Sequence, residues 1–154
     1  MPSVAKRTLI FVGLLVAGLV LYALWFGFKA DNYDKTVVPY LDSALPKLTS
    51  WHYAELRPLL SPQAQLEYQS EQGQATYQLL SKLGALESMG KPAYLGDHSG
   101  SSPGLGDIML VTYQIPLRFE SGPALIKLKL ALASDGKQYF IHQFGIHSEV
   151  FAAD

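Results

Sequence analysis

Hydrophobic residues form one uninterrupted block near the start of the chain and a periodic pattern over the rest of it. The run Thr8–Phe28 contains no charged residue. As a helix with a rise of about 1.5 Å per residue, this run would reach about 31 Å, enough to cross a hydrocarbon core of about 30 Å. The pattern therefore predicts a transmembrane helix at residues 8–28.

Two other structures can contain an apolar run, namely a buried core helix and a cleaved signal peptide. A core helix usually has a polar face and ends nearer twelve residues. The apolar region of a signal peptide is about 7–15 residues long and ends at a small-x-small cleavage site. This run is longer, its end at Trp25–Ala30 is bulky and aromatic, and the chain has no Cys for lipid attachment. We therefore expect an uncleaved signal anchor.

The charges on either side of the run predict its orientation. Lys6 and Arg7 precede it, whereas Lys29 is soon followed by Asp31 and Asp34. The positive-inside rule places residues 1–7 in the cytoplasm and the rest of the chain outside it, after a linker at residues 29–35. In a Gram-negative cell this is a single-pass inner-membrane protein with a periplasmic domain at residues 36–154, bound to the lipid bilayer through Thr8–Phe28.

The apolar positions that follow the linker recur at helical spacing. Thr36 can cap a first short helix that Pro46 should end or kink, and Ser50 can cap a second at Trp51–Leu60. Ser61 followed by Pro62 is a clear start signal for a longer helix. Its expected apolar stripe is Leu66, Gly73, Tyr77, Leu80 and Leu83, and Gly84 is the expected C-terminal stop.

After Gly84 the period of the pattern changes from about 3.6 to 2, which predicts β-strands. Short Gly-containing connections indicate that the last three strands form an antiparallel meander. In the expected strand Pro123–Ala133, alternation places Lys127 and Lys129 on one face and the apolar residues on the other. The expected strands are Leu86–Leu95, Asp107–Glu120, Pro123–Ala133 and Lys137–Ser148, and the Gly/Ser-rich segment Ser99–Gly106 is expected to be an exposed flexible loop. Helices followed by a curved antiparallel sheet of about four strands make an α+β domain.

Composition narrows the classes of function. Residues 31–154 contain nine basic and thirteen acidic residues, a net charge of −4, with no basic cluster in the sequence. We therefore expect no binding to nucleic acid and no peripheral binding to anionic lipid. The absence of Cys excludes disulfides, thiol catalysis and thiolate metal sites.

The order of helices, the junction Leu79–Asp97 and three long strands resembles the nuclear transport factor 2-like, or cystatin-like, superfamily, in particular small membrane-anchored bacterial domains of unknown function. The resemblance covers about Thr36–Ser148. It implies a curved sheet wrapped around helices, with a cone-shaped cavity between them. Members include enzymes, ligand carriers and protein-docking modules, so the fold does not fix the function. No catalytic signature of a member stands at a matching position.

No constellation of residues predicts catalysis, a cofactor or a metal. The four histidines are scattered, and His142 and His147 are five positions apart on one expected strand. His142 is the best acid–base candidate, because it shares a predicted strand face with Phe140, Phe144 and Ile146. Among the many aromatic residues, Trp51 and Tyr113 are candidates to line a cavity or a docking patch. The candidate positions are therefore Trp51, Tyr113 and His142.

These observations favour a membrane-anchored interaction or scaffold module without catalytic activity, whose partner is an unidentified periplasmic or membrane protein or a further copy of the chain. The alternative is a domain that binds a small molecule or lipid in the cone-shaped cavity. An enzyme of the ketosteroid-isomerase-like type is not expected, because no carboxylate is predicted inside an apolar pocket.

Overall fold

The computed structural model describes residues 4–152. The chain divides into two compact units, residues 1–36 and residues 37–154. Helix α1 (Val4–Leu48) begins in the first unit and ends in the second.

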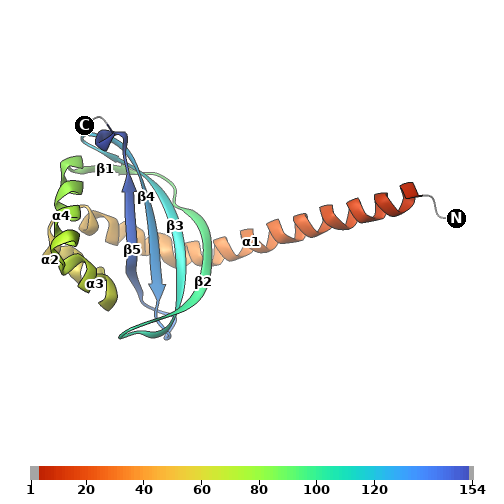
Figure 1. Ribbon diagram of the computed structural model, residues 1–154, viewed down its shortest axis with the longest axis horizontal. Helices are drawn as coiled ribbons and strands as arrows, with labels where there is room; N and C mark the ends of the chain where they lie inside the picture. Colours follow the sequence, from red (N-terminus) through yellow and green to blue (C-terminus); the bar gives the residue numbers. More distant parts are fainter. Residues whose placement is uncertain (1–3, 153–154) are drawn as a thin grey trace. The chain divides into compact units, whose positions relative to one another are not determined.

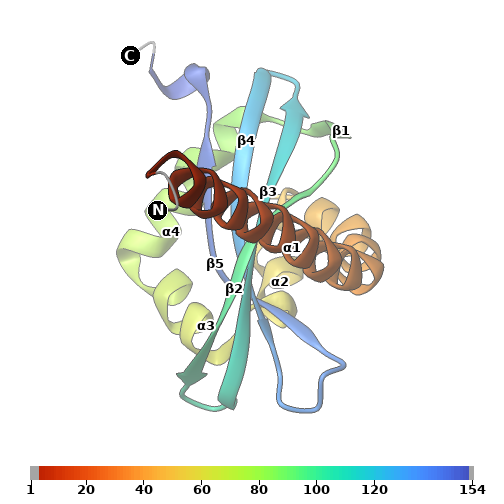
Figure 2. The ribbon, with the colours of Figure 1, turned by 90° about the vertical axis from the view of Figure 1, so that its right-hand side faces the viewer.

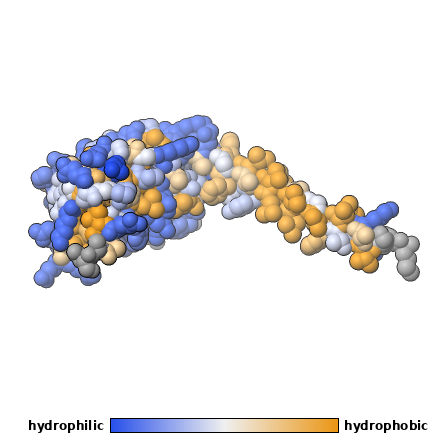
Figure 3. All heavy atoms as spheres, turned by 90° about the horizontal axis from the view of Figure 1, so that it is seen from above, coloured by the Kyte–Doolittle hydropathy of each residue, from blue (hydrophilic) through white to orange (hydrophobic). Residues whose placement is uncertain are grey.

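The first unit is a helix long and apolar enough to span a membrane. Its most apolar window has a mean hydropathy of 2.6 over 18 residues, and none of that window is buried. Figure 3 shows apolar atoms along this helix, and mostly hydrophilic residues with some apolar ones on the face of the second unit that is in view. The predicted apolar helix at residues 8–28 is therefore confirmed as a candidate membrane span.

Residues 29–35, the expected linker, are helical, because α1 continues without a break from Val4 to Leu48. No Gly or Pro occurs between Phe28 and Val38, so nothing in the sequence breaks the helix there. Lys35 Nζ lies 3.9 Å from the Asp31 carboxylate one turn earlier. Thr36 was expected to cap a new helix, but its hydroxyl donates to the Tyr33 carbonyl inside α1. Charged residues here change the polarity of the helix surface without ending the helix.

The second unit is an α+β domain with a sheet of five strands, where about four were expected. Antiparallel strands β3, β4 and β5 form the predicted meander, and β1 and β2 pair with successive parts of β3. Figures 1 and 2 show the strands curving past helices α2, α3 and α4. The strands are β1 (Leu86–Met89), β2 (Ala93–Ser102), β3 (Gly106–Phe119), β4 (Gly122–Leu132) and β5 (Tyr139–His147).

The expected strand Leu86–Leu95 is two strands, because Gly90 and Pro92 interrupt it. Gly90 packs against Pro116, and its N–H donates to the Pro116 carbonyl at 2.7 Å. The expected flexible loop Ser99–Gly106 is wrong for Ser99–Ser102, where β2 continues and pairs with β3. Only residues 103–105 form a turn, which connects β2 to β3. Backbone hydrogen bonds of a sheet ladder do not depend on the side chain, so a Gly/Ser-rich segment can occupy it.

The helical part of the domain begins with the last turns of α1. Val37, Leu41, Leu45 and Leu48 are buried as their spacing predicts, and α1 ends two residues after Pro46. Short helices follow: α2 (Tyr53–Leu56), the 3₁₀ turn η1 (Arg57–Leu59), α3 (Pro62–Gln69), α4 (Glu71–Leu80) and the 3₁₀ turn η2 (Ser81–Leu83). A further 3₁₀ turn, η3 (Glu149–Phe151), follows β5.

The long helix expected after Pro62 is two helices. Ser61 caps α3 as predicted, by accepting the Ala64 N–H. Ser70 caps α4 in the same way from Gly73, so the chain turns between the two helices. The turn explains why Leu66 is 71% exposed, although a single helix would have placed it on the buried stripe with Tyr77. Gly84, at φ 80°, ends the helical region as predicted.

The core lies between the helices and one face of the sheet. Register pairs Val111 with Leu130 and Tyr113 with Leu128, so these residues share that face. Each of these four side chains is 0% exposed. The inner face of the sheet is therefore apolar and buried, and Lys127 and Lys129 point to the outer face, as alternation predicted.

Candidate functional site

The space between helices and sheet is filled by side chains. Tyr113 is 0% exposed at the centre of β3, and its ring meets the Tyr94 ring edge-on with centroids 5.8 Å apart. Ile115 and Ile126, its neighbours on the inner face, are also 0% exposed. A cavity that admitted water-sized molecules would leave accessible area on the side chains that line it. Tyr113 is thus a core residue and does not line an open site.

Trp51 connects the end of the helices to the start of the sheet. Its indole N–H donates to the Gly84 carbonyl at 2.7 Å, and its ring packs against Tyr77 and Phe119 with centroids 5.5 and 5.9 Å away. Trp51 has φ 61°, the one described non-glycine residue with a positive φ. A bulky residue in this region is strained. The ring contacts hold it there, and its half-buried edge lines a shallow hollow with Ser50 and Ala85.

His142 lies on edge strand β5 at a β-bulge. Lys129 pairs with Gln143 and Leu130 pairs with Ile141, so His142 is the extra residue between them. The bulge reverses the alternation, and Phe144 therefore faces inward with Leu128. The expected common face of Phe140, His142, Phe144 and Ile146 is therefore wrong, because Phe140 pairs with Ala131 on the outer face.

The imidazole of His142 contacts the start of α3. Its Nδ1 lies 3.1 Å from the Ser61 hydroxyl oxygen, which also accepts the Ala64 N–H at 3.2 Å. Burial lowers the pKa of His142 below its ordinary value, with the positive charge of Lys129 acting in the same direction and Glu67 opposing it. A serine beside a histidine is the beginning of a nucleophilic pair. Ser61 is 0% exposed, however, so its hydroxyl is closed to a substrate and serves as a helix cap.

The three predicted positions therefore lie apart along the fold. Trp51 follows α1, Tyr113 is in the middle of β3, and His142 is on edge strand β5. Among the described residues, no group of three or more His, Asp or Glu side chains could hold a metal ion.

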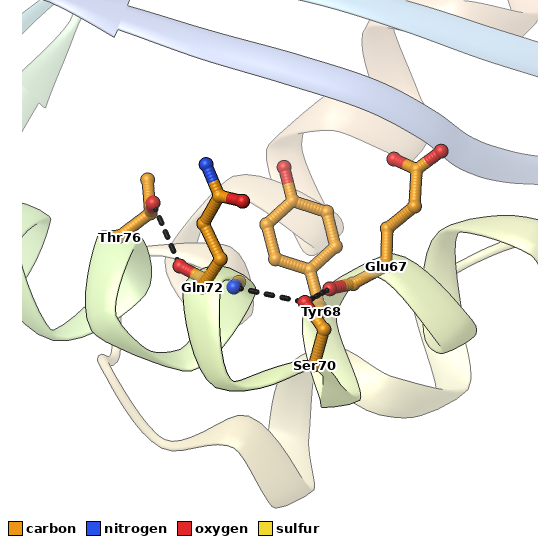
Figure 4. Close-up of a pocket in the computed structure, with 6 residues that line it drawn as sticks. Glu67, Tyr68, Ser70, Gln72 and Thr76 are labelled. Carbon is orange, nitrogen blue, oxygen red and sulfur yellow. Dashed lines mark hydrogen bonds between the residues drawn. The ribbon is translucent and has the colours of Figure 1, made fainter.

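A polar hollow lies at the junction of α3 and α4. Figure 4 shows Glu67, Tyr68 and Gln72 pointing in the same direction, toward a neighbouring strand. Tyr68 stacks on Phe144 with ring centroids 5.0 Å apart and planes inclined by 7°, and its hydroxyl donates to the Phe144 carbonyl. Burial raises the pKa of Tyr68 to about 12, so its phenol stays protonated near neutral pH. The hollow thus carries one carboxylate, from Glu67, and several neutral polar groups.

A second hollow lies on the outer face of β4 and β5, and Phe144, whose ring stacks on Tyr68, is among the residues that line it. Its volume is about 220 Å³. At its middle is Gly145, opposite Lys127 in the sheet, where a Cβ would meet nothing within 4 Å. We call the outer-face residues that line this hollow the lysine face: Lys127, Lys129, Gln143, Gly145 and His147.

Sequence reasoning missed the lysine face as a site. Lys127 and Lys129 were placed on one side of their strand, but the neighbours across β5 depend on the bulge at His142. With regular pairing, Gln143 would lie opposite Leu128 and point inward. The bulge places Gln143 and Gly145 beside the two lysines, and no sequence signal for the bulge was available.

No protein-family model, curated protein or solved structure matches this chain.

Proposed function

We propose that this chain is a single-pass membrane-anchored interaction module without catalytic activity. Residues 8–28 cross the inner membrane, residues 1–7 are cytoplasmic and the α+β domain works in the periplasm. The apolar, unburied helix of the first unit supports the anchor, and Lys6 and Arg7 before it support the orientation.

The observation that carries the interaction role is the closed inner face of the sheet. Small-molecule sites are usually clefts or cavities of about 300–1,000 Å³ that bury most of the ligand. Here Tyr113, Leu128 and Leu130, which the resemblance to the nuclear transport factor 2-like superfamily would place around a cone-shaped cavity, are all 0% exposed. A filled core leaves the outer surface of the domain as the part that can bind.

The same observation disfavours the two other functions. A carrier of a small molecule or lipid needs an open interior, and the described inner face offers none that reaches these side chains. An enzyme of the ketosteroid-isomerase-like type needs an acidic or basic group in an apolar pocket. The inner face of β3 and β4 instead carries apolar and aromatic side chains such as Val111, Ile115 and Ile126.

Location and binding mode are tested separately. A reporter that is active only outside the cytoplasm should work when fused after Asp154, and a cytoplasmic reporter at the same site should stay inactive. The reverse result contradicts the orientation.

For the binding mode, native mass spectrometry of the full chain released from membranes should give the mass of the unliganded protein. A stoichiometric small molecule or lipid retained by the domain would support the carrier function instead.

A further inference from the structure

The charge of the domain is unevenly distributed over its surface. Residues 31–154 have a net charge of −4, yet the lysine face carries Lys127 and Lys129 with no acidic residue among the side chains that line it. No described carboxylate forms an ion pair with either lysine. The Cα atoms of residues two apart on a strand are separated by about 6.6–6.8 Å, so the side chains of Lys127 and Lys129 form one positive patch.

Opposite charge lies on the surface of α3 and α4. The segment Gln63–Thr76 contains Glu67 and Glu71 and no Lys or Arg. Both glutamates are exposed, and neither forms an ion pair with a described residue. Beside Glu67 is Leu66, which is 71% exposed, the most exposed large hydrophobic residue of the second unit. We call Leu66, Glu67 and Glu71 the glutamate ridge.

The two surfaces carry opposite charges, and each adds a feature that an apolar contact can use. The hollow of the lysine face has open space at Gly145, where a Cβ would meet nothing within 4 Å, and Leu66 of the ridge is 71% exposed. If Leu66 of one copy filled the hollow of a second copy, Glu67 and Glu71 of the first copy would lie close to the ammonium groups of the second. Exposed ion pairs are individually weak, so a stable contact between the two surfaces needs both the apolar contact and the charges.

We propose that the lysine face of one copy of this chain binds the glutamate ridge of a second copy. This inference rests on the proposed function, because anchoring in one bilayer holds copies at a high effective concentration in which a weak contact is populated. The contact is heterologous, because each copy uses one surface toward one neighbour and a different surface toward the other, so repetition of the contact produces a ring or an open row of copies. An anionic bilayer surface is a poorer occupant, because the net charge of −4 opposes its approach.

Because the chain has no Cys, an introduced thiol is the only one present. The first experiment co-expresses two full-length variants with different tags, Leu66→Cys and Gly145→Cys, and oxidises the membranes mildly. We expect a disulfide-linked dimer that carries both tags, at a level on the order of tenfold above the dimers of either variant alone. Ser121→Cys, in an exposed turn, replaces Leu66→Cys as the control and should give no such dimer with Gly145→Cys. Absence of the mixed dimer, or linkage of like variants only, overturns the proposal.

The second experiment reverses charges. Adding Lys127→Glu and Lys129→Glu to the Gly145→Cys chain should reduce the mixed dimer on the order of tenfold, since two attractions become repulsions. Adding Glu67→Lys and Glu71→Lys to the Leu66→Cys partner should then restore it. A matched control, Lys82→Glu with Lys137→Glu, makes the same change in net charge at exposed residues outside the two surfaces and should leave the dimer unchanged. Loss without restoration overturns the charge pairing.

The reporter fusion after Asp154 separates this inference from the proposed function. If the fusion is active and the mixed dimer is absent, the anchored module stands and self-association is wrong. If the mixed dimer forms and the fusion is inactive, the contact stands and the periplasmic location is wrong. A disulfide between the Gly145→Cys chain and a different protein, in place of the second copy, also overturns the proposal.

Discussion

The hydroxyl oxygen of Ser61 lies 3.1 Å from Nδ1 of His142 and 3.2 Å from the Ala64 nitrogen, so one buried atom joins the start of α3 to the edge strand β5. The backbone repeats the connection, because the Ser61 N–H donates to the Ile141 carbonyl at 2.9 Å. Tyr68 adds a further contact along the same edge through its stack on Phe144. Helix α3 thereby covers an edge strand whose backbone groups would otherwise be open to pairing.

Replacing Ser61 should therefore cost more than removing an ordinary cap. Ser61→Ala loses the bond to the Ala64 N–H and the bond to His142, at a buried position, and should destabilise the domain by about 1–3 kcal/mol. Ser70→Ala is the matched control, because Ser70 caps α4 with a bond of 3.0 Å to Gly73 but is exposed. It should cost about 1 kcal/mol or less. Urea unfolding measures both values, and equal costs would show that the contact with His142 contributes nothing.

Stability should depend on pH through His142. Burial lowers the pKa of this imidazole in the folded state, so the unfolded chain binds a proton more readily than the folded one. The stabilisation is fully present above the unfolded pKa of about 6.5 and is lost as pH falls through the lower folded value. The urea midpoint should decline as the pH falls below about 6.5, which begins above the range in which most carboxylates titrate. His142→Gln should flatten this decline. If the urea midpoint of the variant declined with pH as steeply as that of the original chain, groups other than His142 would be responsible for the pH dependence.

A fragment that begins before the core residues of α1 should fold alone. Val37–Leu48 belong to the second unit and contribute buried side chains, so Asp31–Asp154 retains the whole core. We expect this fragment to be soluble, to unfold cooperatively and to be insensitive to reducing agents, because no disulfide is present. Circular dichroism and urea unfolding test this expectation. An insoluble or molten product would show that the apolar helix or a partner completes the core.

Trp51 provides a probe in the same fragment, because Trp25 lies outside it and the chain has two Trp residues. The emission of the folded fragment should be blue-shifted and should move to longer wavelength on unfolding, since the ring packs against Tyr77 and Phe119. Trp51→Phe keeps an aromatic ring and removes the donor to the Gly84 carbonyl, which should cost about 1–3 kcal/mol. A cost near zero would show that water replaces the indole N–H at Gly84.

Hydrophobic periodicity predicted the core well, because burial selects the residues that share a face. Val37, Leu41, Leu45 and Leu48 in α1 and Ile126, Leu128 and Leu130 in β4 are buried as their spacing indicates. Boundaries that depend on the backbone alone were predicted less well. The continuation of α1 through residues 29–35 and of β2 through Ser99–Ser102 is maintained by backbone hydrogen bonds, which leave no mark in the side-chain pattern.

The candidate positions were harder to predict, because the bulge at His142 changes which side chains share a face. Up to Ile141 the pairing of β5 with β4 follows strict alternation, and beyond Gln143 it is shifted by one residue. The shift buries Phe144 and places Gly145 beside Lys127. The extra residue of the bulge, His142, contacts Ser61, which is 81 positions away in the sequence, and the local sequence of β5 gives no sign of this contact.

The two faces of β4 give the most direct test of the fold. Leu128 is 0% exposed on the inner face, and Leu128→Ala should cost about 2–5 kcal/mol, from lost transfer free energy plus a cavity. Lys127 is its exposed neighbour on the outer face, and Lys127→Ala should cost no more than about 0.5 kcal/mol. Urea unfolding of Asp31–Asp154 measures both. If Lys127→Ala proved as damaging as Leu128→Ala, the outer face would be buried in the folded fragment, and the lysine face could not be an open surface for a second copy.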